Sequence, residues 1–518
     1  MTGSPAIDPD ALTVEAIRDG LLADAPVTVL GLARSGIAMA RFLADAGARV
    51  TVYDGRTAEA LAEAIAALEG RPVRLALGPD VDPASTWTDA RLVTTSPSIN
   101  PDFPTTEPRL RGALRALVDR RAAGDRSLPA VISEPDLFLR LCVAPTIGVT
   151  GTKGKTTTSS LTASILATDA DHPVVLGGNI GVPILDRLAE LTPRHRVVYE
   201  LSELQLPTLS RGTTIAVYTN VTSDHLDRHG SLDAYRRVKR ILAEKVDPDG
   251  AVVLNAEDPV VAGYADAGTA RKVLYGRGDP TAGGLGVVDG WVVAHGVRAL
   301  DGDAVTDGRI LPVDELGIPG AHNVSNALAA VAVGALFGIP AGSIREAAAA
   351  FTGVEHRLEH VATVDGVRFI NDSQGTQPDA VIAALQAFPG PIVLIAGGRD
   401  KGVDLSALAP VVAERAAAAV LIGESGPDLE RRFRDAGLGR TERSATLDDA
   451  VERADALARE ALGARRGVGG GEVEDVPATV LLSPAAASFD MFPDYAARGR
   501  AFKDAVADLV AARARSRP

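Results

Sequence analysis

One segment of this chain, residues 147–166, combines a strand, a glycine-bearing loop and a helix in an order that few folds allow. Its sequence is IGVTGTKGKTTTSSLTASIL. An apolar strand ends at Thr150 and a helix starts near Thr156, so the first amides of that helix have no intrahelical partners. A strand that leads through a glycine turn into a helix is typical of parallel sheets covered by helices. The segment therefore predicts an α/β fold.

The loop between this strand and helix has the composition of a phosphate-binding turn. Free amides and the helix dipole favour an anion there, and the loop glycines allow close backbone approach. A lysine can neutralise the β- and γ-phosphates, and a threonine hydroxyl can ligate Mg²⁺. The common P-loop spacing would need glycine at Val149, so this is the shorter G-T-x-G-K-T pattern. We expect a nucleotide to bind at Gly151, Thr152, Lys153, Gly154, Lys155, Thr156 and Thr157.

The same alternation of strands and helices recurs along the 518 residues, which are too many for one hydrophobic core. A strand, a glycine turn, a helix and a second strand run through residues 27–54, as in half of a doubly wound fold. We predict three α/β domains: Rossmann-like at 1–140, central with a parallel sheet at 141–354, and Rossmann-like at 355–518. Residues 102–130 predict a connection with one Arg/Ala-rich helix, and residues 461–476 predict a flexible surface loop.

Composition excludes several classes of protein. The net charge of −14 disfavours a nucleic-acid binder, which needs a basic surface. The single cysteine, Cys142, excludes an intramolecular disulfide and a multi-cysteine metal site. No run of about 18 apolar residues and no apolar leader is present, so we expect a cytoplasmic protein without membrane contact. A monomer is the default expectation.

Two later strands lead into groups that suit a hard cation. Glu200 ends the strand in VVYELSELQL, and His225 lies in the loop DHLDRH. The carboxyl ends of parallel strands meet at one sheet edge, so Glu200 is a candidate Mg²⁺ ligand beside the phosphate loop. Zinc is disfavoured because no H-E-x-x-H frame or second cysteine is present, and solvated loop charges remain the simple alternative. Lys239 lies in an Arg-rich helix, and residue chemistry alone does not distinguish it from a solvated basic face.

Eight motifs occur in the order found in the Mur ligases, and the chain resembles that family between residues 27 and 505. The motifs are GTKGKTTT (151–158), GGNIG (177–181), ELSELQL (200–206), NVTSDHLDRHG (220–230), AHNVSNALAA (321–330), HRLE (356–359), NDSQGT (371–376) and LLSPAAASFDMF (481–492). The resemblance implies an ADP-forming ligase that turns a carboxylate into an acyl phosphate and then into an amide. It is greatest to the members that add D-glutamate to UDP-N-acetylmuramoyl-L-alanine in peptidoglycan synthesis, and hence in cell wall biogenesis, cell shape and cell division.

The resemblance also implies roles for individual residues. Lys155, Glu200, His225 and Lys239 fall on catalytic positions, and Thr156, Glu200, His225 and Lys239 fall on Mg²⁺ ligands, Lys239 as a carbamate. Asn323 and Asn326 match adenine contacts, while Arg357 and Asp372 match third-domain ATP residues. The uridine-diphosphate pocket would be lined by Arg34, Ser35, Gly55, Arg56 and Ser96, with Asn179 further along the muramoyl site. Glutamate would be held by Thr376, Lys401 and Ser488, with Tyr495 nearby.

The chain departs from the family pattern at the amino-acid end. Gln374 stands where many members have lysine, and Glu203 stands where serine is usual. Because Gln374 lacks the positive charge of that lysine, the identity of the incoming amino acid is less constrained. L-glutamate or another stem-peptide amino acid is therefore an alternative substrate. The folate-adding relatives are disfavoured because they lack a Rossmann-like domain before the ATP domain.

Two alternatives come from other classes of protein. Asp54 would suit an NAD-linked oxidoreductase, but Ala33 replaces the second glycine of G-x-G-x-x-G and GTKGKT would stay unexplained. A non-catalytic regulator predicts loss of at least one of the four catalytic residues, and all four are present.

Overall fold

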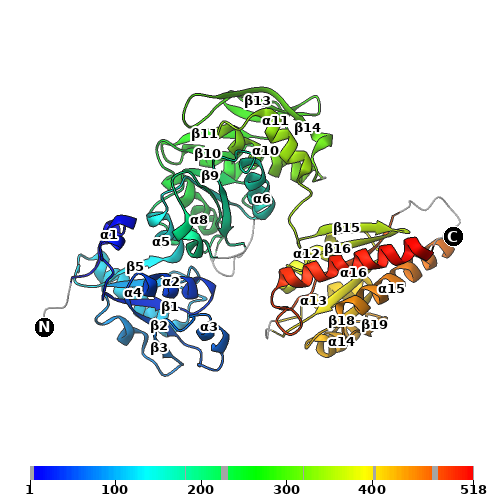
Figure 1. Cartoon of the computed structure of the whole chain (residues 1–518), viewed down its shortest axis with the longest axis horizontal. Helices are drawn as coiled ribbons and strands as arrows, with labels where there is room; N and C mark the ends of the chain where they lie inside the picture. Colours follow the sequence, from blue (N-terminus) through cyan, green and yellow to red (C-terminus); the bar gives the residue numbers. More distant parts are fainter. Residues whose placement is uncertain are drawn as a thin grey trace. The chain divides into compact units, whose positions relative to one another are not determined.

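The computed structural model describes residues 5–180, 183–222, 231–318, 320–400, 404–468 and 476–516. The chain divides into two compact units, Met1–Phe351 and Thr352–Pro518 (Figure 1). Within the described ranges the first unit contains two sheets and the second unit contains one, each flanked by helices. The α/β fold class predicted from the sequence is confirmed. The predicted domain limits near residues 140 and 354 stay predictions.

The first sheet is parallel throughout, in the order β3-β2-β1-β4-β5. Its strands are β1 (Pro26–Leu30), β2 (Arg49–Asp54), β3 (Arg74–Leu77), β4 (Leu92–Thr95) and β5 (Ala130–Ser133). Its helices are η1 (Pro9–Ala11), α1 (Val14–Arg18), α2 (Arg34–Asp45), α3 (Ala62–Ala66), η2 (Pro83–Trp87), α4 (Pro108–Ala122) and α5 (Glu134–Leu141). The strand order reverses between β1 and β4, which is where ligands bind in such sheets. Helix α4 is the Arg/Ala-rich helix expected in residues 102–130.

The second sheet has the order β14-β13-β12-β11-β10-β9-β6-β8-β7, parallel from β7 to β12 and antiparallel from β12 to β14. Its strands are β6 (Thr146–Thr150), β7 (Val174–Gly178), β8 (Arg196–Glu200), β9 (Ile215–Tyr218), β10 (Ala251–Asn255), β11 (Arg271–Tyr275), β12 (Gly284–Val288), β13 (Trp291–Arg298) and β14 (Val305–Pro312). Its helices are α6 (Lys155–Leu166), η3 (Ile184–Glu190), η4 (Leu206–Thr208), α8 (Leu232–Lys245), α9 (Pro259–Ala262), η5 (Gly263–Asp266), η6 (Val313–Glu315), α10 (Ala321–Leu336) and α11 (Ala341–Ala350).

Both faces of this second sheet are buried, because its strands send apolar side chains to alternate sides. Ile147 and Val149 pack with α6 and α10, whereas Val197 and Tyr199 pack with α5 and α8. The second of these clusters continues into the helices of the first sheet, which explains why the two sheets belong to one unit.

The sheet of the second unit has the order β15-β16-β20-β17-β18-β19, antiparallel only between β15 and β16. Its strands are β15 (Glu359–Val364), β16 (Val367–Asn371), β17 (Ile392–Gly397), β18 (Ala416–Ile422), β19 (Thr441–Arg443) and β20 (Ala478–Leu482). Its helices are α12 (Pro378–Ala387), α13 (Leu408–Arg415), α14 (Gly426–Asp435), α15 (Leu447–Val468) and α16 (Tyr495–Ser516). Helices α15 and α16 cover one face and α12 to α14 the other (Figure 1).

One expectation for this unit was wrong in part. Residues 461–468, which the sequence assigns to a flexible loop, continue helix α15. The apolar spacing of α15 extends to Leu462, and alanine and arginine favour a helix beyond it. None of the described helices is both long enough and apolar enough to span a membrane.

Candidate active site

The phosphate-loop candidate lies at the carboxyl end of β6. Helix α6 begins at Lys155, one residue before the expected start, and Gly154 caps it in the left-handed conformation with φ +84°. A Cβ atom on Gly154 would lie 2.4 Å from Asn326 Oδ1, and one on Gly151 would lie 2.0 Å from Thr219 Oγ1. Glycine is therefore required at both positions for the loop to keep this shape.

Lys155 places its ammonium group across this loop. Its Nζ atom donates to the carbonyl oxygens of Gly151 and Thr152, both at 2.9 Å. Thr156, the next residue, is buried at the start of the helix. The loop thus combines a cation, a hydroxyl and the free amides of a helix N-terminus, which together suit a polyphosphate.

Glu200 ends β8, the strand that pairs with β6, and its side chain is almost completely buried at 1% exposure. Its Oε1 atom accepts a hydrogen bond from Asn179 Nδ2 at 2.9 Å. Its Oε2 atom accepts none from the described residues. A buried carboxylate oxygen without a donor is unfavourable unless a cation binds there, so Glu200 fits a metal-ligand role.

Lys239 lies beneath the phosphate loop and not on a solvated basic face. It is on α8 with an exposure of 0%, although the neighbouring Arg237 is exposed. Its Nζ atom donates to Thr150 Oγ1 and to the Gly151 carbonyl, both at 3.2 Å. The structure therefore brings Lys155, Glu200 and Lys239 to the same sheet edge. His225 and Lys401 lie outside the described residues.

A cavity of about 750 Å³ adjoins the phosphate loop. Asn326 lines this cavity, and its Nδ2 atom donates to Asn323 Oδ1 at 3.2 Å on the first turns of α10. Several residues to which the sequence assigned no individual role also line it, among them Asn220, Arg236, Asn255, Glu257, Asp258, Arg277, His322 and Ser325. Five of these eight residues end or follow β9, β10 and β11, so the strand order supplies the signal that could have found those five.

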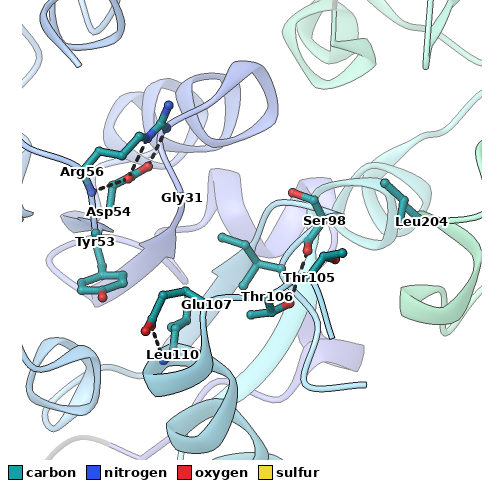
Figure 2. A pocket seen from close by; sticks show the side chains of 12 residues that line it. Gly31, Tyr53, Asp54, Arg56, Ser98, Thr105, Thr106, Glu107, Leu110 and Leu204 are labelled. Carbon is teal, nitrogen blue, oxygen red and sulfur yellow. Dashed lines mark hydrogen bonds and ion pairs between the residues drawn. The ribbon is translucent and has the colours of Figure 1, made fainter. Parts of the chain in front are cut away.

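A second cavity of about 520 Å³ lies at the switch point of the first sheet (Figure 2). Gly55 and Arg56 line it, while Arg34 and Ser35 begin α2 and the buried Ser96 follows β4. Residues that the sequence analysis did not assign to this pocket also line it: Gly31, Tyr53, Asp54, Ser98, Ile99, Thr105, Thr106, Glu107, Leu110 and Leu204.

The carboxylate of Asp54 is occupied by donors of its own chain (Figure 2). Leu32 N donates to Oδ2 at 2.9 Å, and Arg56 donates from N and Nε to Oδ1 and from Nη2 to Oδ2. Burial raises the pKa of Asp54, but these hydrogen bonds outweigh it and leave the pKa below its ordinary value. Asp54 therefore positions Arg56 at the cavity.

In the second unit, Asp372 directly follows β16 and is 4% exposed. Burial raises the pKa of Asp372 to about 6, opposed by hydrogen bonds from Ser483 Oγ at 2.6 Å and Leu358 N at 3.2 Å. Arg357 lies one residue before Leu358, and the backbone on either side of it has positive φ at His356 (63°) and Leu358 (46°). Such strained backbone is concentrated at ligand sites.

Arg498 is a functional candidate that the sequence analysis missed. It lies on α16 with 1% exposure, and burial lowers the pKa of its guanidinium to about 10. Its guanidinium donates to Ser373 Oγ and Ser373 O at 3.0 Å and to the carbonyls of Ala486 and Ala487 at 3.3 Å. It thereby ties the turn that carries Thr376 to the loop that carries Ser488, and Tyr495 begins the same helix.

The motif order and this geometry agree with comparisons to known proteins. The model of the Mur ligase middle domain matches residues 149–334, and that of the Mur ligase glutamate ligase domain matches residues 356–463. A protein of Symbiobacterium thermophilum named UDP-N-acetylmuramoylalanine–D-glutamate ligase is 39% identical over 93% of this chain and 97% of its own length. The chain belongs to the Mur ligase family. Ligases of the same name from Pelotomaculum thermopropionicum and Acidobacterium capsulatum are 37% and 38% identical to this Mur ligase, over 93% of its length and 97% and 95% of theirs.

Membership confirms the family predicted from the motifs. Mur ligases join an acid to an amine at the expense of ATP and release ADP, so the protein is an ATP-dependent ligase. The oxidoreductase alternative is set aside, because the family assignment covers the segment that it left unexplained.

Proposed function

We propose that this Mur ligase adds D-glutamate to UDP-N-acetylmuramoyl-L-alanine in peptidoglycan precursor synthesis. The observation that carries the proposal is the identity of 37–39% with ligases of that name, over 93% of the chain. The geometry supports it, because Lys155, Glu200 and Lys239 meet at the end of one sheet where a carboxylate and a triphosphate can be joined.

In the first step, an oxygen of the alanyl carboxylate attacks the γ-phosphorus of ATP. The new O–P bond forms as the bond to the β-phosphate oxygen breaks, which gives an acyl phosphate and ADP. Lys155 lies at the loop carbonyls and neutralises the transferring charge, together with the first amides of α6. Asn323 and Asn326 are proposed to contact the adenine, and Arg357 and Asp372 are proposed ATP-binding residues.

In the second step, the glutamate amine attacks the acyl carbonyl carbon. The amide bond forms, the amine loses a proton, and phosphate leaves with the former carboxylate oxygen. Thr376, Lys401 and Ser488, with Tyr495 nearby, hold the amino acid. Arg498 supports this arrangement by tying the two loops together.

The residues at the sheet edge suit Mg²⁺. Thr156, Glu200, His225 and a carbamate of Lys239 would hold it, and the ion would spread the negative charge of the transferring phosphoryl group. The Oε2 atom of Glu200 supports this proposal, because it is buried and accepts no hydrogen bond from the described residues.

The cavity at the first sheet is proposed to hold the uridine diphosphate. Arg34, Ser35, Gly55, Arg56 and Ser96 surround its phosphates and base. Asn179 would then contact the muramoyl portion, which its hydrogen bond to Glu200, a proposed metal ligand, supports. A cytoplasmic monomer that binds neither nucleic acid nor membrane completes the proposal, in keeping with the net charge of −14.

Phosphate release tests this function directly. The purified protein is incubated with UDP-N-acetylmuramoyl-L-alanine, ATP and Mg²⁺, and D-glutamate, L-glutamate or D-aspartate is added separately. We expect release with D-glutamate. Release with L-glutamate alone would assign the opposite hand, as Gln374 allows, and no release with any of them would refute the proposal.

A further inference from the structure

The segment that follows β9 is hydrogen-bonded to the phosphate loop. Strands β6 and β9 pair in parallel with Thr150 opposite Tyr218, so the loops after them lie side by side. Thr152 N donates to the Asn220 carbonyl at 2.8 Å, and Thr222 N donates to Thr152 Oγ1 at 3.0 Å. The shape of the phosphate loop is therefore set by residues 219–222 as well as by its own glycines.

Asn220 makes the most specific of these contacts, because its side-chain amide pairs with both backbone groups of Lys153. Lys153 N donates to Asn220 Oδ1 at 2.9 Å, and Asn220 Nδ2 donates to Lys153 O at 2.9 Å. Thr219 Oγ1 donates to the same carbonyl at 2.6 Å. A flipped amide would place donor against donor and acceptor against acceptor, so the orientation of the side chain is fixed.

This pairing controls the next peptide of the loop. A peptide unit is planar and trans, so the Lys153 carbonyl and the Gly154 N–H point in opposite directions. Holding that carbonyl at Asn220 and Thr219 turns the Gly154 N–H away from them. Gly154 is the N-cap of α6, where amides are available for an anion, and both Gly154 and Asn220 line the 750 Å³ cavity.

We propose that Asn220 is a positioning residue whose side-chain amide holds the phosphate loop in the shape that accepts the triphosphate of ATP. The proposal rests on the proposed function, because it assumes that this loop binds the transferring nucleotide. Asn220 itself forms no bond with the reacting atoms in this scheme. Its effect is exerted through the peptides on either side of Lys153.

Two substitutions separate this role from general stabilisation. Asn220→Ala removes both hydrogen bonds, whereas Asn220→Asp keeps the acceptor for Lys153 N and sets an oxygen against Lys153 O. We expect kcat/KM for ATP to fall about tenfold or more in each variant, which corresponds to one or two hydrogen bonds. The KM for UDP-N-acetylmuramoyl-L-alanine should stay unchanged. The affinity for ADP, measured by calorimetry without the other substrates, should fall by a similar factor.

Thr213→Val is the matched control. It removes a buried hydrogen bond of 2.8 Å to the Ile215 carbonyl near the start of β9, away from the phosphate loop. We expect a lower thermal midpoint in this variant but an unchanged KM for ATP. The proposal is overturned if folded Asn220→Ala or Asn220→Asp protein loses thermal stability as Thr213→Val does while keeping the wild-type KM for ATP and ADP affinity. Wild-type protein that neither binds nor hydrolyses ATP would refute the proposed function itself.

Discussion

Lys239 shows how the fold changes the chemistry open to a single side chain. Removal of an ammonium group from water is unfavourable. The buried Nζ atom of Lys239 donates to Thr150 Oγ1 and to the Gly151 carbonyl, and it lies 5.5 Å from the ring centroid of Tyr235. If the ammonium group lost a proton, the neutral amine could form an N–C bond with carbon dioxide and release a second proton, which would replace the cation with a carboxylate-like carbamate. Such a group could join Glu200 in binding a divalent ion at the same sheet edge.

Replacement of Lys239 by alanine should therefore nearly abolish ligation. We expect activity to fall on the order of 100-fold or more, since a metal ligand is lost, and to recover in part when a short carboxylic acid is added. Phosphate release measures both effects. Arg237→Ala, on the exposed face of the same helix, is the control and should be fully active. Undiminished activity of Lys239→Ala would contradict the carbamate role.

At the scale of elements, several polar candidate-site residues in each unit lie at the carboxyl ends of parallel strands. β6, β8 and β9 lead to the phosphate loop, Glu200 and Asn220, and β16 leads to Asp372. The turns at these strand ends are polar, whereas the strands themselves are apolar. Where a charged group of such a turn is buried, its desolvation lowers the stability of the folded protein. Asp372 is the clearest example, because its pKa of about 6 stands well above the usual 3.8.

That shift predicts a particular pH dependence of stability. Folded protein holds the proton of Asp372 up to about pH 6 while unfolded chain releases it near pH 4, so stability falls as pH rises through this window. Between pH 4.5 and pH 7.5 the loss should be about 2 kcal/mol, because about 1 kcal/mol is already lost at pH 4.5. Urea unfolding at pH 4.5 and 7.5 should show this loss in the wild type and not in Asp372→Asn. The exposed Asp435→Asn variant should behave like the wild type, and equal pH dependence in all three proteins would refute the prediction.

Across the whole molecule, the features that depend on local sequence pattern could be predicted from the sequence. Buried strands such as β6 and the glycine turn after it follow from apolar runs and backbone geometry, which are local properties. The contacts of Arg498 and Asn220 depend on segments far apart in sequence, up to 125 residues for Arg498 with Ser373. Asn220 pairs with Lys153 across 67 residues. A single sequence does not show which distant residues pair, so these contacts were found only in the folded structure.

In the proposed reaction the chain transfers the γ-phosphoryl group of ATP to the carboxylate of the first substrate before the amide forms. Oxygen transfer tests this most directly. UDP-N-acetylmuramoyl-L-alanine labelled with ¹⁸O in its carboxylate is converted with ATP and D-glutamate, and the released phosphate is analysed by mass spectrometry. We expect one ¹⁸O atom in each phosphate released from fully labelled substrate, because the former carboxylate oxygen leaves with the phosphate. Phosphate that carries no label, despite amide formation, would contradict it.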